Sequence, residues 1–158
     1  MLLVQIKVIN LKEDADRWEF TSNYLDQLGV PYERYPARRP IPITYRCLVN
    51  DALTFGWGLD TLVVNDDMAF DSLAYPANAP IVTLWRGRPG HVCPRAFAAS
   101  QVGWEMLDLV WDGHTKICHA WTPLVEKVGT ILDNTSHRWG IRRYGEDGVP
   151  AIKIVEAV

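Results

Sequence analysis

The order of hydrophobic and polar positions along the chain predicts strands that alternate with helices. Short apolar runs bounded by polar or turn-forming residues are typical of buried strands. Such runs occupy residues 2–10, 32–35, 59–65, 81–85 and 151–155, with a shorter one over 116–120. Segments of helical periodicity lie between most of them, whereas residues 121–132 fit either a helix or a strand.

Three segments have the periodicity and the end signals of amphipathic helices. The first is expected to begin at a cap on Asp14 or Asp16 and to end at about Leu28, before Gly29. The second is expected to begin at Thr44 and end at Gly56, and the third to begin at Pro94. The expected buried faces are Trp18, Leu25 and Leu28; Tyr45, Leu48, Val49, Ala52 and Leu53; and Ala98, Val102, Met106 and Leu109. Strands joined through helices predict an α/β layer fold with a largely parallel sheet, and 158 residues fit one domain, 1–158.

The third expected strand ends abruptly in two adjacent carboxylates, Asp66 and Asp67. Aspartate is common in turns, so a plain turn after the strand accounts for the pair. A second interpretation depends on position, because ligands of open α/β sheets bind outside the carboxyl ends of the strands. Two carboxylates there suit a hard cation, Mg²⁺ or Mn²⁺, which can bridge the two phosphates of a nucleotide diphosphate.

Composition and charge narrow the functional classes. The formal net charge of −3 gives no global positive field that would attract nucleic acid or a membrane surface. The three cysteines are too few and too scattered for a disulfide framework, and their odd number fits a reducing compartment. The N-terminus lacks the features of a signal peptide, and no apolar run approaches the ~20 residues needed to span a bilayer. We therefore expect a cytoplasmic protein without a membrane span.

Three further groups of residues have candidate chemistry. The first offers zinc ligands, namely His91, Cys93, Cys118 and His119, although H-x-C and an adjacent Cys-His pair match no strong zinc pattern. The second is the loop with Arg86 and Arg88, which either binds phosphates or is a solvated loop. The third is a tail of interleaved basic and aromatic residues, Arg138, Trp139, Arg142, Arg143 and Tyr144, a pattern that can stack bases and hold phosphates.

Several segments resemble, in the same order, those of glycosyltransferase family 25, the lipooligosaccharide galactosyltransferase type. Val8-Ile-Asn-Leu-Lys12 followed by Asp16-Arg17 is similar to the family's opening V-I-N-L strand and the Asp-Arg pair after it. Residues 25–34 and Ala37 are similar to the segment that leads from the first helix into the second strand. Leu62-Val-Val-Asn-Asp-Asp-Met-Ala-Phe70 resembles L-V-L-E-D-D-V-x-F, and Pro123-Leu-Val-Glu126 with Ser136 resembles the late P-P-L-V-E-Q segment.

The resemblance implies a GT-A-like three-layer sandwich and a metal-dependent transfer of sugar from a nucleotide-diphospho-sugar to an acceptor. The family's acidic triplet, which holds Mn²⁺ or Mg²⁺ and the donor diphosphate, falls on Asn65, Asp66 and Asp67. Asn10 is then expected near the nucleotide, with Arg17 close to it. The remaining expected roles fall to His119 or His137 as further metal ligands, Arg86 or Arg88 at the diphosphate, and Glu126 or Asp112 as the acceptor base.

Departures from the family pattern leave alternatives open. Asn65 replaces the first acid of the triplet, and residues 43–48 lack the serine and histidine of the family's G-C-x-x-S-H segment. The region between the third helix and Trp121 is also short for the family. These departures favour a second hypothesis, a non-catalytic GT-A-like module that binds a nucleotide, a sugar or a protein. Under a third hypothesis the acceptor is modified nucleic acid, held by the tail, rather than a glycan or a protein.

Overall fold

The structure, a computed structural model, describes residues 5–70, 75–85, 90–132 and 135–137. Its centre is a six-stranded sheet with the strand order β2-β1-β3-β6-β5-β7. The strands are β1 (Gln5–Asn10), β2 (Tyr32–Pro36), β3 (Thr61–Asn65), β5 (Ile81–Thr83), β6 (Ala96–Ala99) and β7 (Gly129–Ile131). β6 is antiparallel to both neighbours and the other pairs are parallel. A separate ribbon pairs β4 (Met68–Phe70) with β8 (Thr135–His137).

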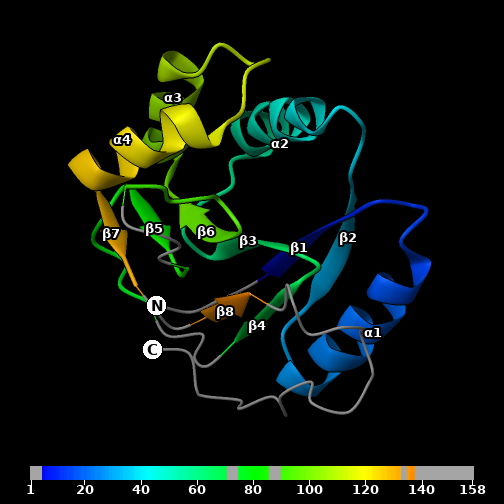
Figure 1. Ribbon diagram of the computed structural model, residues 1–158. Coiled ribbons are helices and arrows are strands. Elements are labelled where there is room, and N and C mark those ends of the chain that lie inside the picture. The colour runs from blue at the N-terminus through cyan, green and yellow to red at the C-terminus, as the bar shows by residue number, and fades with distance from the viewer. Residues whose placement is uncertain (1–4, 71–74, 86–89, 133–134, 138–158) are drawn as a thin grey trace.

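Helices cover both faces of the sheet, which confirms the mixed α/β class. They are α1 (Ala15–Leu25), the 3₁₀ turn η1 (Asp26–Leu28), α2 (Ile41–Phe55), α3 (Gln101–Val110) and α4 (Cys118–Val128). α1 lies on one side of the sheet with β4 and β8, and the other three α-helices lie on the opposite side (Figure 1). Within the described ranges, no helix has both the length and the apolar character needed to cross a membrane.

Apolar side chains fill two cores, one on each face of the sheet. Along β1, Ile6 and Val8 belong to the core under α1, whereas Ile9 belongs to the core under α2, α3 and α4. This division follows from the two-residue period of a strand, which sends successive side chains to opposite faces. In the second core Phe97 and Trp121 are fully buried, with their ring centroids 4.6 Å apart in an edge-on arrangement.

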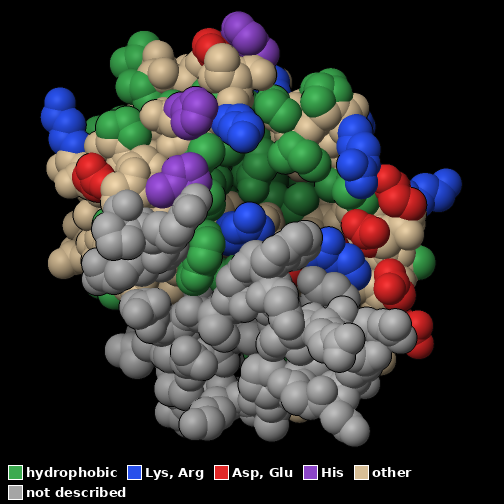
Figure 2. Space-filling view, in the orientation of Figure 1, with side chains coloured by type: hydrophobic (Ala, Val, Ile, Leu, Met, Phe, Trp, Pro, Cys, Tyr) green, Lys and Arg blue, Asp and Glu red, His purple; other side chains and the backbone are tan. Residues whose placement is uncertain are grey.

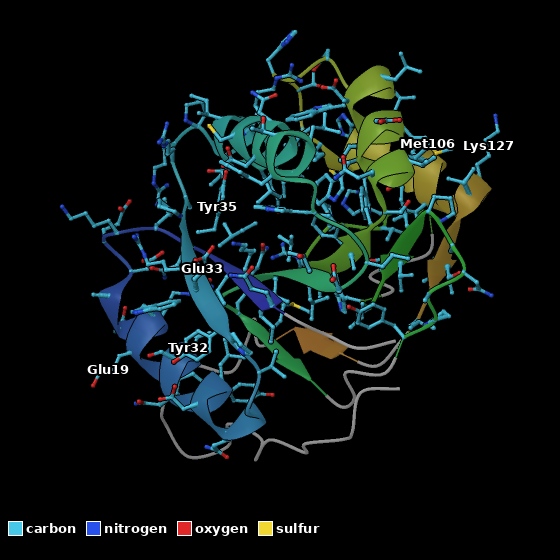
Figure 3. The ribbon with its side chains drawn as sticks, turned by 180° about the vertical axis from the view of Figure 1, so that it is seen from behind. Glu19, Tyr32, Glu33, Tyr35, Met106 and Lys127 are labelled. Atoms are coloured by element: carbon cyan, nitrogen blue, oxygen red, sulfur yellow. The ribbon has the colours of Figure 1, made fainter. Side chains whose placement is uncertain are left out.

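Two tyrosines of the edge strand β2 connect the sheet to a helical segment on each face (Figure 3). The Tyr32 hydroxyl donates to the carboxylate of Asp26 at the end of α1, and the Tyr35 hydroxyl donates to the carboxylate of Asp51 in α2. The acceptor Asp26 raises the pKa of Tyr32 to about 12, so this hydroxyl remains a donor over the physiological range. These two hydrogen bonds therefore help to hold α1 and α2 in position on opposite faces of the sheet.

The strand order creates a topological switch point between β1 and β3. From β1 the chain passes through α1 to β2 on one side, and from β2 it returns through α2 to β3 on the other side. At such a point the connections after the two strands diverge and leave a crevice at their carboxyl ends. β1 ends at Asn10 and β3 ends at Asn65, and Ile9 pairs with Asn65 in register, so both strands end at the same edge.

The second helix begins three residues earlier than its expected cap at Thr44. α2 starts at Ile41, after Pro40 in an extended conformation. Pro42 is the second residue of the helix. A proline is tolerated in the first turn because the N–H that it lacks would have no partner within the helix there. Thr44 is buried inside the first turn, where its hydroxyl accepts a hydrogen bond from the Arg38 N–H and donates one to the Arg38 carbonyl.

The third helix begins later than expected, because Pro94 precedes a strand. Residues 96–99 form β6, and Ser100 then caps α3 by accepting a hydrogen bond from the Gly103 N–H. A run of four small or apolar residues has no period that separates helix from strand. The expected buried face of α3 is therefore wrong: Val102 and Leu109 are exposed. The buried residues of this helix are Gly103, Trp104 and Leu107.

The strand expected over 116–120 is also wrong, because α4 begins at Cys118. The helical apolar repeat consists of Ile117, Trp121, Leu124 and Val125, all of which are buried. A boundary placed at residue 120 cuts this repeat in two, so neither half shows the helical period. Residues 121–132 contain the rest of α4 and β7. The strand expected over 151–155 lies outside the described residues.

Two leucines of α3 test this assignment of faces. Leu107 is 1% exposed and Leu109 is 86% exposed, on the same helix. We expect Leu107→Ala to lower the free energy of unfolding by about 2–5 kcal/mol, because it leaves a cavity in the core. Leu109→Ala should change it by less than about 0.5 kcal/mol. Urea denaturation of both variants measures the difference, and equal losses would contradict the observed orientation of α3.

Candidate functional site

A cavity of about 690 Å³ opens at the carboxyl ends of β1 and β3. Its wall is formed by the segment after β1 and the first turn of α1, the start of α2, the turn after β3, the segment before β6, and the residues around the start of α4. Figure 2 shows the hollow, with apolar side chains in its wall and Lys and Arg side chains beside it. The cavity therefore lies at the switch point, where α/β sheets generally bind ligands.

Asp66 and Asp67 form the turn between β3 and β4, and both line the cavity. They are only 6% and 4% exposed, whereas turns usually face water. Arg17 Nη2 lies 3.0 Å from Asp66 Oδ1 and 3.5 Å from Asp67 Oδ2. Arg95 Nη1 lies 3.3 Å from Asp67 Oδ2. The pair is thus a turn, as the simpler interpretation expected, but a buried turn held by two guanidinium groups.

Neighbouring polar groups fix the orientation of Asp66. Asn10 Nδ2 donates to Asp66 Oδ2 at 2.7 Å, and the Thr21 hydroxyl donates to the backbone carbonyl of Asp66 at 2.9 Å. Arg34 Nε donates to Asn10 Oδ1 at 2.9 Å, which directs the amide group of Asn10 so that its NH₂ faces the carboxylate. Arg17 and Thr21 are one helical turn apart on α1, so one face of this helix holds both the side chain and the backbone of Asp66.

Asn65 extends the site toward α2. Its Oδ1 lies 3.5 Å from the hydroxyl oxygen of Tyr45, which also lies 3.3 Å from the Pro94 carbonyl oxygen. Burial raises the pKa of Tyr45, so its hydroxyl stays neutral and acts as a donor. Asn65 therefore lines the cavity with a neutral amide group in place of a carboxylate. An amide oxygen can ligate a hard cation, although it adds no charge.

Burial is the largest influence on the charge of Asp66. Desolvation raises the pKa of its carboxyl above the ordinary aspartate value, and the adjacent Asp67 acts in the same direction. The hydrogen bond from Asn10 and the charge of Arg17 lower the pKa without cancelling the effect of burial. Any additional positive charge that enters the cavity would therefore stabilise the ionised form of Asp66.

The residues of the cavity fit a divalent cation that binds together with an anionic ligand. Carboxylate and amide oxygens are the ligands that Mg²⁺ and Mn²⁺ prefer. Arg17 and Arg95 already balance the charges of Asp66 and Asp67, so a divalent cation alone would leave an excess of positive charge. Among the described residues, four cationic and three acidic side chains line the cavity, and a phosphate-bearing ligand would offset that excess.

The structure brings together several residues that the sequence singled out. They are Asn10, Arg17, Asn65, Asp66 and Asp67. Asn10 is buried behind Asp66, and the other four line the cavity. These residues come from the ends of β1 and β3, the turn after β3 and the first turn of α1. The position of Asp66 and Asp67 after a buried strand was expected from the residue pattern, and Asn10, Arg17 and Asn65 were expected from the family resemblance.

The structure leaves three other described candidates, His119, Glu126 and Asp112, outside the cavity lining. His119 is exposed on the first turn of α4, and Glu126 is exposed near its end. Asp112 is exposed and accepts hydrogen bonds from the backbone N–H groups of His114 and Thr115. These bonds lower the pKa of Asp112 to about 2, which makes its carboxylate a weak base.

Three further candidates fall wholly or partly outside the described residues. Arg86 and Arg88 belong to the range 86–89, and the basic and aromatic tail belongs to 138–158, both beyond the described part of the chain. The backbone of His137 belongs to β8, where it pairs with Met68, the residue after Asp67.

Sequence reasoning missed Arg95, the second cation at the acidic pair. A helix expected from Pro94 separates Arg95 from β3, whereas the observed strand brings it alongside: the Asn65 N–H donates to the Arg95 carbonyl at 2.8 Å. The Arg95 guanidinium also lies 5.4 Å from the ring centroid of Trp85, within the range of cation–π contacts. Only the antiparallel direction of β6, which the sequence pattern does not show, places Arg95 at this edge.

Asp66→Asn should change the pH dependence of stability. Because burial raises the native pKa of Asp66, its contribution to stability is fully present below about pH 4 and is lost as the pH rises through the native pKa. The free energy of unfolding of the wild type, minus that of Asp66→Asn, should therefore decrease with rising pH across this window. Urea titrations at several pH values measure it, and an increase would mean that Arg17 and Asn10 outweigh burial.

Comparison with known proteins does not assign a family or a function to the chain. No protein-family model matches the chain, and no curated protein or solved structure matches it significantly. The resemblance to the family 25 glycosyltransferases therefore rests on the segments quoted above, and the function of the chain must be inferred from those segments and from the cavity.

Proposed function

We propose that the chain is a metal-dependent glycosyltransferase that moves a sugar from a nucleotide-diphospho-sugar to an acceptor. The observation that carries this proposal is the buried Asp66–Asp67 pair, flanked by Arg17 and Arg95, in a cavity at the switch point of the sheet. Hard oxygen ligands beside guanidinium groups suit a complex of a cation with a diphosphate. The three layers and the acidic pair after β3 support a GT-A-like arrangement.

At the diphosphate, the acidic and the basic residues would have different roles. Asp66 and Asp67, with the amide oxygen of Asn65 beside them, would hold Mn²⁺ or Mg²⁺. Such an ion, when bound, neutralises the charge that develops on a leaving diphosphate. Arg17 and Arg95 contact the carboxylates and have further N–H groups, which can donate to phosphate oxygens in the cavity.

The cavity can hold more of the donor than its phosphates. Its volume of about 690 Å³ lies within the ~300–1,000 Å³ common for small-molecule sites. Ile9, Ala37 and Ile41 contribute apolar surface to the wall. Such surface suits the flat faces of a nucleobase or the apolar face of a sugar ring, while the charged end of the cavity binds the diphosphate.

A second candidate function, binding without transfer, has support of its own. Arg17 and Arg95 already pair with the two carboxylates, and neither Asp112 nor Glu126 lines the cavity as a base for an acceptor. A module that holds a nucleotide through its phosphates could use these arginines alone. It would need neither a cation nor a general base, so its affinity for nucleotides would not depend on Mn²⁺.

Nucleotide binding should depend on the cation, because cation and diphosphate balance each other's charge in the cavity. In titration calorimetry with UDP, GDP, CDP and ADP, we expect Mn²⁺ to tighten binding of at least one nucleotide by about tenfold or more, or about 1.4 kcal/mol. Asp67→Asn should remove this gain. Asp108→Asn is the matched control, since Asp108 pairs with Arg46 at 3.0 Å outside the cavity lining.

Release of free sugar separates transfer from binding alone. With water as the acceptor, the water oxygen bonds to the anomeric carbon while the bond between that carbon and the phosphate oxygen breaks. Free sugar, nucleoside diphosphate and a proton are released. Sugar release by the wild type with Mn²⁺, lost in Asp67→Asn and kept in Asp108→Asn, supports the transferase. Binding that is equally tight with and without Mn²⁺, and without sugar release, favours the binding module. Failure of every nucleotide to bind with any metal contradicts the proposal.

A further inference from the structure

Three side chains with nitrogen or sulfur ligand atoms meet beside the cavity, and two of them line it. His91, Cys93 and Cys118 each offer one ligand atom, and these atoms all lie within 4.8 Å of one another. His91 and Cys93 belong to the segment before β6, and Cys118 is the first residue of α4. All three are partly buried, the cysteines are not in disulfides, and both Cys93 and Cys118 line the cavity.

We propose that His91, Cys93 and Cys118 bind one zinc ion, with its fourth coordination position open toward the cavity. Zinc binds tetrahedrally at ~2.3 Å from sulfur and ~2.0–2.1 Å from nitrogen, which separates its ligand atoms by roughly 3.5–3.8 Å. The observed limit of 4.8 Å exceeds this separation by about one ångström. Small side-chain rotations are enough to close that difference.

The ligand chemistry distinguishes this cluster from the acidic pair that lines the same cavity. Thiolate and imidazole groups select zinc and similar ions, whereas the oxygens of Asp66 and Asp67 select Mg²⁺ or Mn²⁺. Two thiolates and one neutral imidazole balance the charge of Zn²⁺. A neutral complex costs little to bury, so a partly buried site is suitable for it. The two groups of residues would therefore bind ions of different classes.

Backbone contacts preorganise the cluster. The Thr122 hydroxyl accepts a hydrogen bond from the Val92 N–H and donates one to the Val92 carbonyl, both at 3.0 Å. Val92 lies between His91 and Cys93, and Thr122 lies one helical turn after Cys118 on the same face of α4. The two bonds therefore hold the His91–Cys93 segment against the helix turn that contains Cys118, and the ligands need little rearrangement to meet.

Zinc at this position would also stabilise the segment that leads to Arg95. The Arg95 N–H donates to the Cys93 carbonyl at 2.9 Å, and the Arg95 side chain contacts Asp67. The ion would thus brace the wall that holds one arginine of the acidic pair. The zinc site itself does not depend on the proposed transferase activity, because its ligands and its preorganisation are independent of any nucleotide.

Metal analysis of the full chain, purified under reducing conditions, tests the proposal. After incubation with zinc and removal of excess, we expect one zinc per chain by mass spectrometry of the elements. Competition with a chromophoric chelator should show affinity weakened by more than about 100-fold in His91→Ala, Cys93→Ser and Cys118→Ser, because each removes a ligand. Cys47→Ser and His119→Ala are controls outside the cluster, and both should bind zinc as the wild type does.

A measurement on the wild type makes the test independent of how the variants fold. X-ray absorption at the zinc edge should show two sulfur ligands at ~2.3 Å and nitrogen or oxygen ligands at ~2.0–2.1 Å. Zinc bound by oxygen and nitrogen alone overturns the proposal, as does the absence of stoichiometric zinc. A Cys93–Cys118 disulfide in the zinc-treated protein, or an equal loss of zinc in Cys47→Ser, overturns it too. Asp67→Asn should leave the zinc content unchanged.

Discussion

The burial of two adjacent carboxylates at the end of β3 is the constraint on which the site depends. A buried ion that loses its partner costs about 3–5 kcal/mol, so Asp66 and Asp67 require groups that surround them in defined positions. The neighbours of β3 supply these groups. β1, on one side, ends in Asn10. β6, on the other side, is antiparallel and therefore begins beside the same carboxylates, directly after Arg95. α1 adds Arg17, so strand order, strand direction and helix docking all converge on one turn.

The same network explains why the cavity is suited to a compound ligand. Its carboxylates and arginines are nearly balanced in charge, so neither a cation nor an anion alone fits well. A cation bound to a diphosphate brings positive and negative charge into the cavity together. The carboxylates can then bind the cation while the arginines bind the diphosphate. The His91–Cys93–Cys118 cluster contributes its two cysteines to this wall and offers thiolate and imidazole ligands. A cavity with two separate classes of ligand atom can distinguish two metals by chemistry rather than by affinity alone.

The sequence predicted the parts of the fold that depend on short-range pattern. The strands before and after α1, the buried face of α2 and the position of Asp66 after a buried strand all follow from periodicity and end signals. Asn10 and Arg17 were grouped with the acidic pair through the resemblance to the family 25 glycosyltransferases, and the ends of β1 and β3 at one edge, together with the first turn of α1, account for that placement. The sequence did not predict β6, since residues 96–99 lack a distinguishing period and the reversal of a strand leaves no local signal. Arg95 was missed for that reason. His91, Cys93, Cys118 and His119 were candidate zinc ligands by residue type alone. Which of them meet depends on where α4 docks, and the structure groups the first three and leaves His119 exposed.

A crystal structure with a nucleoside diphosphate and Mn²⁺ tests the central claim most directly, because manganese scatters anomalously and reports its own position. The account predicts an anomalous peak within about 2.0–2.4 Å of oxygens from Asp66 or Asp67, with the diphosphate bridging this ion to Arg17 or Arg95. A nucleotide bound elsewhere, or a diphosphate in this cavity with no manganese at the carboxylates, would contradict the account.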